Sequence, residues 1–300
     1  MSRWRELPAE AGDGAVSIEG LTGVRHDLSR PLRTSVGELA VVEGDRSTDG
    51  SLHSQGVYEP QESAIISTLL SPGMQVLDVG ANIGYFSLLA SNRVGPTGVI
   101  HAFEPEPLNF RILRKNLSAN DCRNVEIWAC ALSDYTGTQP LYLSRSNLGR
   151  HSFAFRNVPA TSAAVQVRTR TMDDFCDDVI EDGPLTLVKI DVEGAEGRVL
   201  RGAGRLLARE NVTVWFELWP EGLSNSGSDP EELLRWLDGY GFHAGLYDDV
   251  RLTPVRLESV WRKLREHWRG VRYLLLDRSP ERIVAAAEAV SLVDPLQRAA

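Results

Sequence analysis

The sequence predicts an α/β protein built on a doubly wound, mainly parallel sheet with helices on both faces. Short apolar runs bounded by turn residues recur along the 300-residue chain, and segments with helical spacing separate them. The first clear unit is an apolar run that ends in a glycine-rich turn at residues 80–84, followed at once by a helical pattern. Strands that alternate with helices form parallel sheets, and ligands bind outside the carboxyl ends of such strands.

Periodicity predicts the individual elements. Strands are expected over residues 75–79, 98–103, 124–130, 185–191, 212–217, 242–247 and 271–276, and helices near 83–93, 107–119, 194–208 and 230–239. Two alternating segments, 140–144 and 165–171, fall between the third and fourth strands. They are typical of an inserted antiparallel β-ribbon.

The turn after the first strand indicates the kind of ligand. Gly80 and Gly84 let the backbone pass close to a ligand, and Asn82 tolerates positive φ. The dinucleotide pattern G-x-G-x-x-G is absent, and Asp78 at the strand end disfavours phosphate. Glu104 ends the second strand, where it is placed to accept hydrogen bonds from both hydroxyls of a ribose. These features favour S-adenosylmethionine (SAM), which has a sulfonium, an ammonium and a ribose diol but no phosphate. A plain strand-to-helix turn of another α/β protein is the alternative.

Further motifs point to a family. They are Tyr58-Glu59-Pro60, DVGANIGYFS from Asp78, FEPEP from Phe103, ALSD from Ala131 and KIDVEGAE from Lys189. In this order the set resembles the FkbM family of SAM-dependent methyltransferases, over residues 57–220. The resemblance implies a class I methyltransferase (Rossmann-like) fold, with a seven-stranded sheet whose last strand is antiparallel. We therefore expect a methyltransferase domain at 57–278, an N-terminal extension or small cap at 1–56, and a C-terminal helix or tail at 279–300.

The resemblance also implies roles for single residues. The glycine turn would run beneath the methionine part of SAM, Asp78 would fix the turn, and Glu104 would hold the ribose. The segment after the third strand would lie along adenine, although Cys130 stands where many methyltransferases have a carboxylate. The full set implied for the cofactor is Tyr58, Glu59, Asp78, Gly80, Asn82, Gly84, Phe103, Glu104, Pro105, Ala131, Leu132, Asp134 and Asp191.

Removal of a proton from the acceptor needs a general base. His151, in a polar glycine-containing loop, is the leading candidate, and a solvated loop histidine is the alternative. Asp191 and Glu193 follow the fourth strand directly, and they compete for the role. Asp191 alternatively caps the next helix, or the pair binds a divalent cation, but no third ligand is evident and metal is the less favoured option. Glu217 and Trp219 end the fifth strand and are expected in the acceptor pocket, with core packing as the alternative for Trp219.

Composition restricts the partners. A formal net charge of −9 disfavours a nucleic-acid substrate, so we expect a small-molecule acceptor, free or held on a carrier protein. Cys122, Cys130 and Cys176 lack metal-site spacing and are interpreted as reduced core residues. No apolar run is long enough for a membrane span, and a cytoplasmic location is expected. A basic amphipathic segment at 255–272 is expected to pack on its own domain or on a second copy in a homodimer.

The function expected from these features is O-methylation of a small secondary metabolite or sugar hydroxyl. N- or carboxyl-methylation of a natural-product or peptide intermediate stays open. An NAD(P)-dependent oxidoreductase is disfavoured by the missing dinucleotide pattern. A nucleic-acid amino-methyltransferase lacks its aromatic, proline-containing loop after the fourth strand, and a silent binding module would not require Asp78 and Glu104.

Overall fold

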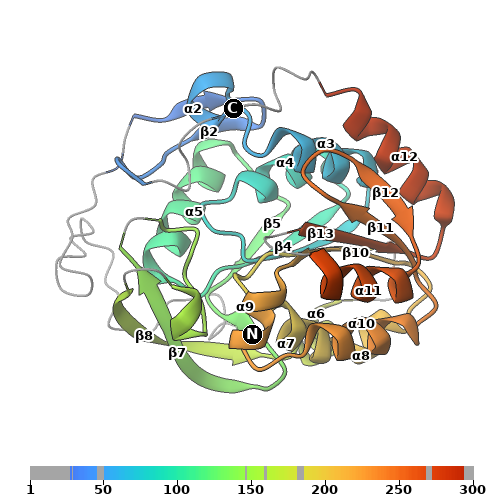
Figure 1. Ribbon diagram of the computed structural model, residues 1–300. Helices are drawn as coiled ribbons and strands as arrows, with labels where there is room; N and C mark the ends of the chain where they lie inside the picture. The colour runs from blue at the N-terminus through green and yellow to red at the C-terminus, as the bar shows by residue number, and fades with distance from the viewer. Residues whose placement is uncertain are drawn as a thin grey trace.

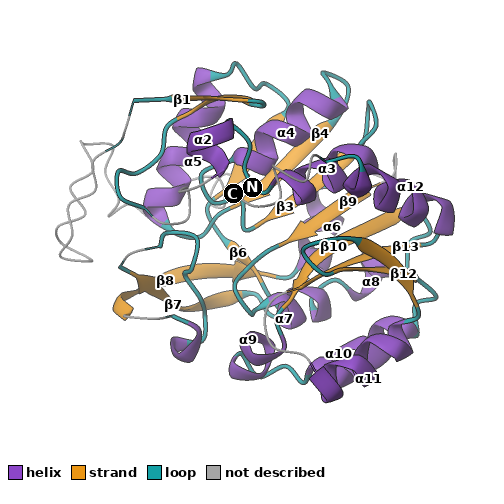
Figure 2. Ribbon diagram, turned by 45° about the horizontal axis from the view of Figure 1, so that its top comes forward, coloured by secondary structure: helices purple, strands orange, loops and turns teal. Residues whose placement is uncertain are grey.

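A large twisted sheet forms the centre of the molecule (Figures 1 and 2). The computed structural model describes residues 28, 30–45, 51–145, 147–158, 161–180, 186–267 and 272–293. Within these ranges the sheet has eight strands in the order β12-β11-β13-β10-β9-β3-β4-β5. In that order they are Leu252–Val255, His243–Tyr247, Arg272–Asp277, Val212–Leu218, Thr186–Ile190, Gln75–Val79, Val99–Phe103 and Val125–Trp128. All seven predicted core strands are present.

The strand directions match the predicted class I methyltransferase fold. Strands β5, β4, β3, β9 and β10 are parallel to one another, whereas β13 runs antiparallel to both β10 and β11. The antiparallel last strand was predicted, but the eighth strand, β12, was not. Strand β12 contains Pro254, a residue type that disfavours the prediction of a strand from sequence. The proline is tolerated because β12 lies at the edge of the sheet.

Alternation along the strands produces two apolar layers. In β3, Val76 faces one layer, whereas Leu77 and Val79 face the other. In β10, Trp215 faces the first layer and Phe216 the second. This period of two, with both faces buried, explains why the strands read as nearly continuous apolar runs.

Helices cover both layers (Figure 1). One face holds α3 (Pro60–Leu69), α4 (Tyr85–Val94), α5 (Pro107–Ala119) and α12 (Pro280–Ser291). The other holds α6 (Met172–Val179), α7 (Glu196–Arg201), α8 (Gly204–Leu207), α9 (Pro220–Asn225), α10 (Pro230–Asp238) and α11 (Leu257–His267). In the described ranges, no helix combines the length and the apolar character that a bilayer crossing requires.

The helix predicted over 194–208 is two helices, α7 and α8. Gly202 separates them, and its carbonyl accepts a hydrogen bond from the backbone N–H of Asp173. A Cβ at Gly202 would lie 2.1 Å from the carbonyl oxygen of Ser133, so the backbones pack directly against each other. The break therefore has a tertiary cause that the local pattern does not contain.

The basic segment at 255–272 begins with α11, which packs on α10 of its own domain. Trp261 is partly buried against the second apolar layer, and the guanidinium of Arg235 lies 5.4 Å from its ring centroid. Trp268 and its neighbours lie outside the described residues, and the homodimer stays a prediction.

The predicted ribbon is present as part of a second, three-stranded sheet. It consists of β7 (Gly137–Ser144) and β8 (Thr161–Arg170), which are antiparallel, and β6 (Ala131–Leu132), which is parallel to β8. The predicted third core strand thus ends at Trp128, and the chain bends into β6 after Ala129 and Cys130.

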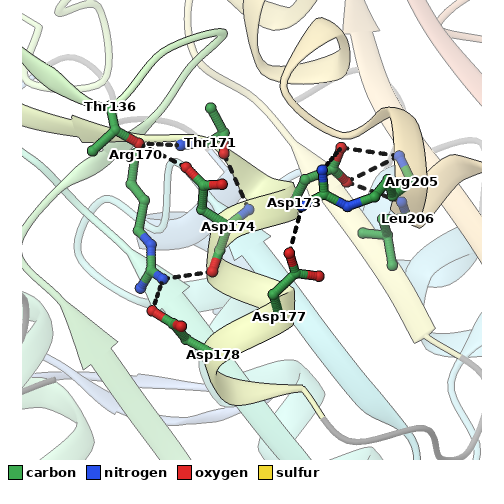
Figure 3. Close-up of polar contacts among 9 residues, drawn as sticks. All are labelled: Thr136, Arg170, Thr171, Asp173, Asp174, Asp177, Asp178, Arg205 and Leu206. Atoms are coloured by element: carbon green, nitrogen blue, oxygen red, sulfur yellow. Dashed lines mark hydrogen bonds and ion pairs between the residues drawn. The ribbon is translucent and has the colours of Figure 1, made fainter.

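Polar contacts around α6 hold this second sheet to the helices (Figure 3). Arg170, at the end of β8, donates to the carboxylate of Asp178 and to the carbonyl of Asp174. Asp173 accepts hydrogen bonds from the backbone N–H groups of Arg205 and Leu206 in α8. The second sheet is thereby fixed at one end, and the loop between β7 and β8 is directed over the carboxyl ends of the main sheet.

Before α3, a hairpin of β1 (Leu32–Thr34) and β2 (Gly37–Leu39) is followed by the short helix α2 (Ser51–Gln55). Asn116 of α5 binds this hairpin: its Oδ1 accepts from the Ala40 N–H at 2.8 Å, and its Nδ2 donates to the Ala40 carbonyl at 3.1 Å. The same Nδ2 donates to the carbonyl of Ile83 at 2.8 Å. One buried amide thus links the hairpin to the glycine turn.

We expect Asn116→Ala to destabilise the protein, because it removes the partners of backbone groups of Ala40 and Ile83 in a buried place. The cost is roughly 1 to 3 kcal/mol for each group left unsatisfied, measurable by urea unfolding. Asn120→Ala is the matched control, since Asn120 makes a similar pair of hydrogen bonds to Glu38 in an exposed place. Equal losses in both variants would contradict the linking role of Asn116.

Candidate active site

A cavity of about 290 Å³ lies at the carboxyl ends of β3, β4, β9 and β10. It contains most of the residues that the sequence predicted for the site. Those that line it are Tyr58, Glu59, Gly80, Asn82, Phe103, Glu104, Pro105, Ala131, Leu132, His151, Asp191, Glu193 and Glu217. The positions come from seven separate stretches of the chain, which the sheet and the inserted ribbon bring together.

The glycine turn has the geometry that the sequence indicated. Gly80 has a φ of 84° and Asn82 a φ of 51°, both in the left-handed region. A Cβ at Gly80 would lie 1.9 Å from the carbonyl oxygen of Asp191, so glycine is required where β3 and β9 approach each other. The N–H groups of Gly80 and Ala81 donate to the carbonyl of Phe103, which fixes the turn to the end of β4.

Glu104 is 5% exposed, and both carboxylate oxygens accept backbone hydrogen bonds. Oε2 accepts from the Asn82 N–H and Oε1 from the Glu106 N–H, each at 2.8 Å. Burial raises the pKa of Glu104 to about 8. These two hydrogen bonds hold the carboxyl group in one orientation beside the cavity. Each oxygen can still accept a further hydrogen bond from a ligand.

Lys189 lines the cavity, but the sequence motifs did not predict a role for it. It is 5% exposed, and its Nζ lies 3.4 Å from Oδ2 of Asp191 and 3.6 Å from Oδ1 of Asp78. Burial lowers its pKa, but Asp191 and Asp78 outweigh this and the net pKa is raised, so the ammonium stays charged. A lysine inside the otherwise apolar strand Thr186–Ile190 was the signal that could have identified it.

Two residues of the predicted turn contribute from behind the cavity. Asp78 does not line it: Oδ2 accepts from the Ser87 hydroxyl at 2.6 Å, and Oδ1 faces Lys189. Gly84 is also outside the lining, where a Cβ would lie 2.6 Å from Cδ1 of Leu113 in α5. The close approach predicted between Gly84 and a ligand is thus a close approach between two helices.

Asp134 and Trp219 are likewise not brought into the cavity lining. The Asp134 carboxylate accepts hydrogen bonds from Arg198 of α7, with donor distances of 2.9 and 3.0 Å. Trp219 packs against Gly222, where a Cβ would lie 2.2 Å from the indole. Contacts of Asp134 with adenine and of Trp219 with the acceptor stay predictions; the Trp219 ring centroid lies 6.0 Å from the guanidinium of Arg150, which lines the cavity.

The loop at 147–151 covers the cavity and brings His151 and Arg150 into it. Its anchor is Leu148, whose N–H donates to Asp45 at 2.9 Å and whose carbonyl accepts from Asn109 at 3.0 Å. Nδ1 of His151 accepts a hydrogen bond from the Ser144 N–H at 3.0 Å. The neutral ring must then carry its proton on Nε2, where it offers a donor and not the lone pair that a general base needs.

Carboxyl groups form a further part of the cavity lining. Burial raises the pKa of Glu193 to about 8, and it raises the pKa values of Glu59 and Glu217 further above the ordinary range. Repulsion by Asp191 adds to each shift. Arg150 partly offsets it at Glu193, with 3.7 Å between Nε and Oε2. Glu59 and Glu193 also have positive φ values of 42° and 53°, which non-glycine residues adopt only where the surroundings enforce them.

Across the described ranges, no three His, Cys, Asp or Glu side chains are grouped so that they could hold a metal ion. The position beside Asp191 is instead taken by the ammonium of Lys189. For SAM the fit is better: a left-handed glycine turn, a buried carboxylate at the end of β4 and the apolar pair Ala131 and Leu132 lie around one cavity.

Comparison with known proteins identifies the family. The model of the FkbM methyltransferase domain matches residues 78–244. Methyltransferase sdnD of Sordaria araneosa is 32% identical over 176 residues, which cover 49% of this chain and 68% of the relative. The 31-O-demethyl-FK506 methyltransferase FkbM of Streptomyces tacrolimicus is 31% identical over 162 residues, which cover 44% and 60%.

Among solved structures, the methyltransferase FkbM of Methylobacillus flagellatus aligns with a TM-score of 0.42 and 18% identity, over 70% of this chain and 47% of that one. The family match extends from the strand that carries Asp78 to the sixth predicted strand, and it includes the glycine turn, Glu104 and the KIDVEGAE segment. The chain therefore belongs to the FkbM family of SAM-dependent methyltransferases.

Proposed function

We propose that the protein methylates a hydroxyl oxygen of a small molecule, of the secondary metabolite or sugar class. The observation that carries this proposal is the cavity, which is of a size that suits small ligands and has a group of buried carboxyls beside the glycine turn. The printed name of the Streptomyces tacrolimicus relative, a 31-O-demethyl-FK506 methyltransferase, specifies an oxygen of a small molecule for that protein.

The residues that would hold SAM are those of the glycine turn, Glu104, Ala131 and Leu132. Gly80 and Asn82 present backbone without a side chain in the way, and Glu104 offers carboxylate oxygens to a ribose diol. The chemistry that SAM supplies when bound is an electrophilic methyl group on a sulfonium. Alignment of the acceptor and exclusion of water are the main tasks left to the protein, and positioning alone contributes roughly 7 to 11 kcal/mol to catalysis.

Glu193 is the residue that we assign as general base. His151 is disfavoured by the Ser144 hydrogen bond, and Asp191 is engaged by Lys189. Glu193 lines the cavity, and its raised pKa of about 8 makes it a better proton acceptor than an ordinary carboxylate. Glu193 would accept the proton of the acceptor hydroxyl, which would leave that oxygen able to attack the methyl group that SAM would supply, with S-adenosylhomocysteine as the leaving group.

We expect a screen of hydroxyl-bearing small molecules, read out as S-adenosylhomocysteine (SAH) formation, to yield a product with its new methyl group on oxygen by NMR. The acceptor screen includes matched amines and carboxylic acids. A methyl group found on nitrogen or as a carboxyl ester would replace the proposed reaction by the corresponding alternative.

We expect Glu104→Ala to weaken SAH binding by roughly 10- to 150-fold, because the hydrogen bonds from both ribose hydroxyls are lost. Isothermal calorimetry measures this. Glu106→Ala is the matched control: Glu106 is also buried, but it caps α5 through the Asn109 N–H and does not line the cavity. The ribose assignment fails if both variants fold and bind SAH equally well.

The base assignment predicts a pH profile. Glu193 must be ionised to accept a proton, so turnover should rise with pH through its raised pKa of about 8 and level off above it. Glu193→Gln should lower kcat by roughly 10²- to 10⁴-fold and abolish this rise. His151→Ala should retain the rise whatever its absolute rate. Loss of the rise in His151→Ala but not in Glu193→Gln would make the histidine the base.

A further inference from the structure

We propose that the methyl acceptor carries a protonated amine and that Glu217 binds this ammonium group as a specificity-determining residue. The inference rests on the proposed function and deepens it, since it names a feature of the substrate. It concerns recognition of the acceptor, whose hydroxyl oxygen is the methylated atom under the proposed function.

Glu217 is a buried carboxyl group with one oxygen that lacks a hydrogen bond. It is 6% exposed, it lines the cavity, and its Oε2 atom has no hydrogen-bond partner among the described residues. The other four lining carboxyls have partners. Glu104 accepts from two backbone N–H groups, and Glu59 shares a side-chain hydrogen bond with Tyr58. Asp191 pairs with Lys189, and Glu193 pairs with Arg150. A buried carboxyl with no partner is unfavourable for folding, and such groups concentrate at functional sites.

The position of Glu217 is on the acceptor side of the site. It lies at the end of β10, which is separated from β3 and its glycine turn by β9. Its cross-strand neighbour is Tyr273 of β13, which also lines the cavity. A group bound to Glu217 would thus lie beyond Asp191 as seen from the glycine turn.

The charge around Glu217 selects a cation over a neutral donor. Five carboxyls line the cavity, at Glu59, Glu104, Asp191, Glu193 and Glu217, against the cations Lys189 and Arg150. Both cations already pair with other carboxylates. A neutral hydroxyl would satisfy one hydrogen bond, whereas an ammonium group would also stabilise the ionised form of Glu217 against repulsion by the neighbouring carboxyls.

Aromatic rings favour the same ligand. Tyr58, Phe86 and Tyr273 contribute to the lining, and Phe86 already has the Lys189 ammonium 4.9 Å from its ring centroid. Faces of aromatic rings attract cations, and the attraction is stronger where water is excluded. An amine group in this part of the cavity would find both carboxylate and ring partners.

The test compares benzylamine with benzyl alcohol as probes of the SAH-loaded protein, by ligand-observed NMR titration. We expect benzylamine to bind at least about tenfold more tightly, as a charge-assisted hydrogen bond predicts, and Glu217→Gln to abolish the preference. Glu221→Gln, which removes an exposed carboxylate four residues further along, is the control and should retain it.

Equal binding of the two probes to wild type, including no detectable binding of either, would overturn the inference, as would a preference that survives in Glu217→Gln. Calorimetry with SAH is done first on each protein. If the wild-type protein does not bind SAH, the proposed function itself fails. If it binds SAH but does not prefer benzylamine, only the inference about Glu217 fails.

A stability measurement separates ligand recognition from a structural role. Because the pKa of Glu217 is raised by burial and then by Asp191, the folded protein retains a proton that the unfolded chain releases, and the free energy of unfolding falls as pH rises. Glu217→Gln does not titrate. We therefore expect it to melt at or above the wild-type temperature, with a gap that widens from about pH 6 to about pH 8. Melting below wild type at both pH values would make Glu217 a structural residue and overturn the assignment.

Discussion

The ammonium group of Lys189 is the interaction on which the rest of the site depends. It lies between the buried Asp78 of β3 and the partly buried Asp191 that follows β9, and it pairs with both carboxylates. The same two strands approach so closely that Gly80 has no room for a side chain beside the Asp191 carbonyl. Charge pairing and backbone packing thus fix the glycine turn from the same side.

The pairing of Lys189 with Asp78 and Asp191 determines which carboxyl groups of the cavity are left to bind a ligand. With Lys189 committed to Asp78 and Asp191, it cannot neutralise the carboxyls further along the sheet, and Arg150 reaches Glu193 from the covering loop. Glu217 is left with an incomplete set of partners in a buried place. Such an arrangement lowers stability at high pH, and its retention is explained if a ligand supplies the missing partner.

Local patterns were sufficient for the parts of the fold and site that depend on a single element. The alternation of strands and helices predicted the sheet, and the turn sequence predicted the positive φ of Asn82. The contacts of residues that pack against a second, distant element could not be predicted from local sequence patterns. A side chain at Gly84 would collide with Leu113 of α5. Asp134 accepts hydrogen bonds from Arg198, 64 residues away in sequence. Each contact joins a turn to a helix that is distant in sequence, which no short motif encodes.

The choice of general base illustrates the same limit in chemical terms. In sequence, His151 has the most suitable ordinary pKa of the candidates, because imidazole titrates near neutrality. Its suitability depends on which ring nitrogen is occupied, and this is decided by the backbone N–H of Ser144 at the end of β7. Glu193 shows the reverse: an ordinary carboxylate is a weak base, yet burial beside Asp191 raises its pKa to about 8. One hydrogen bond at His151 and burial beside Asp191 thus support the proposed choice of Glu193 over His151 as general base.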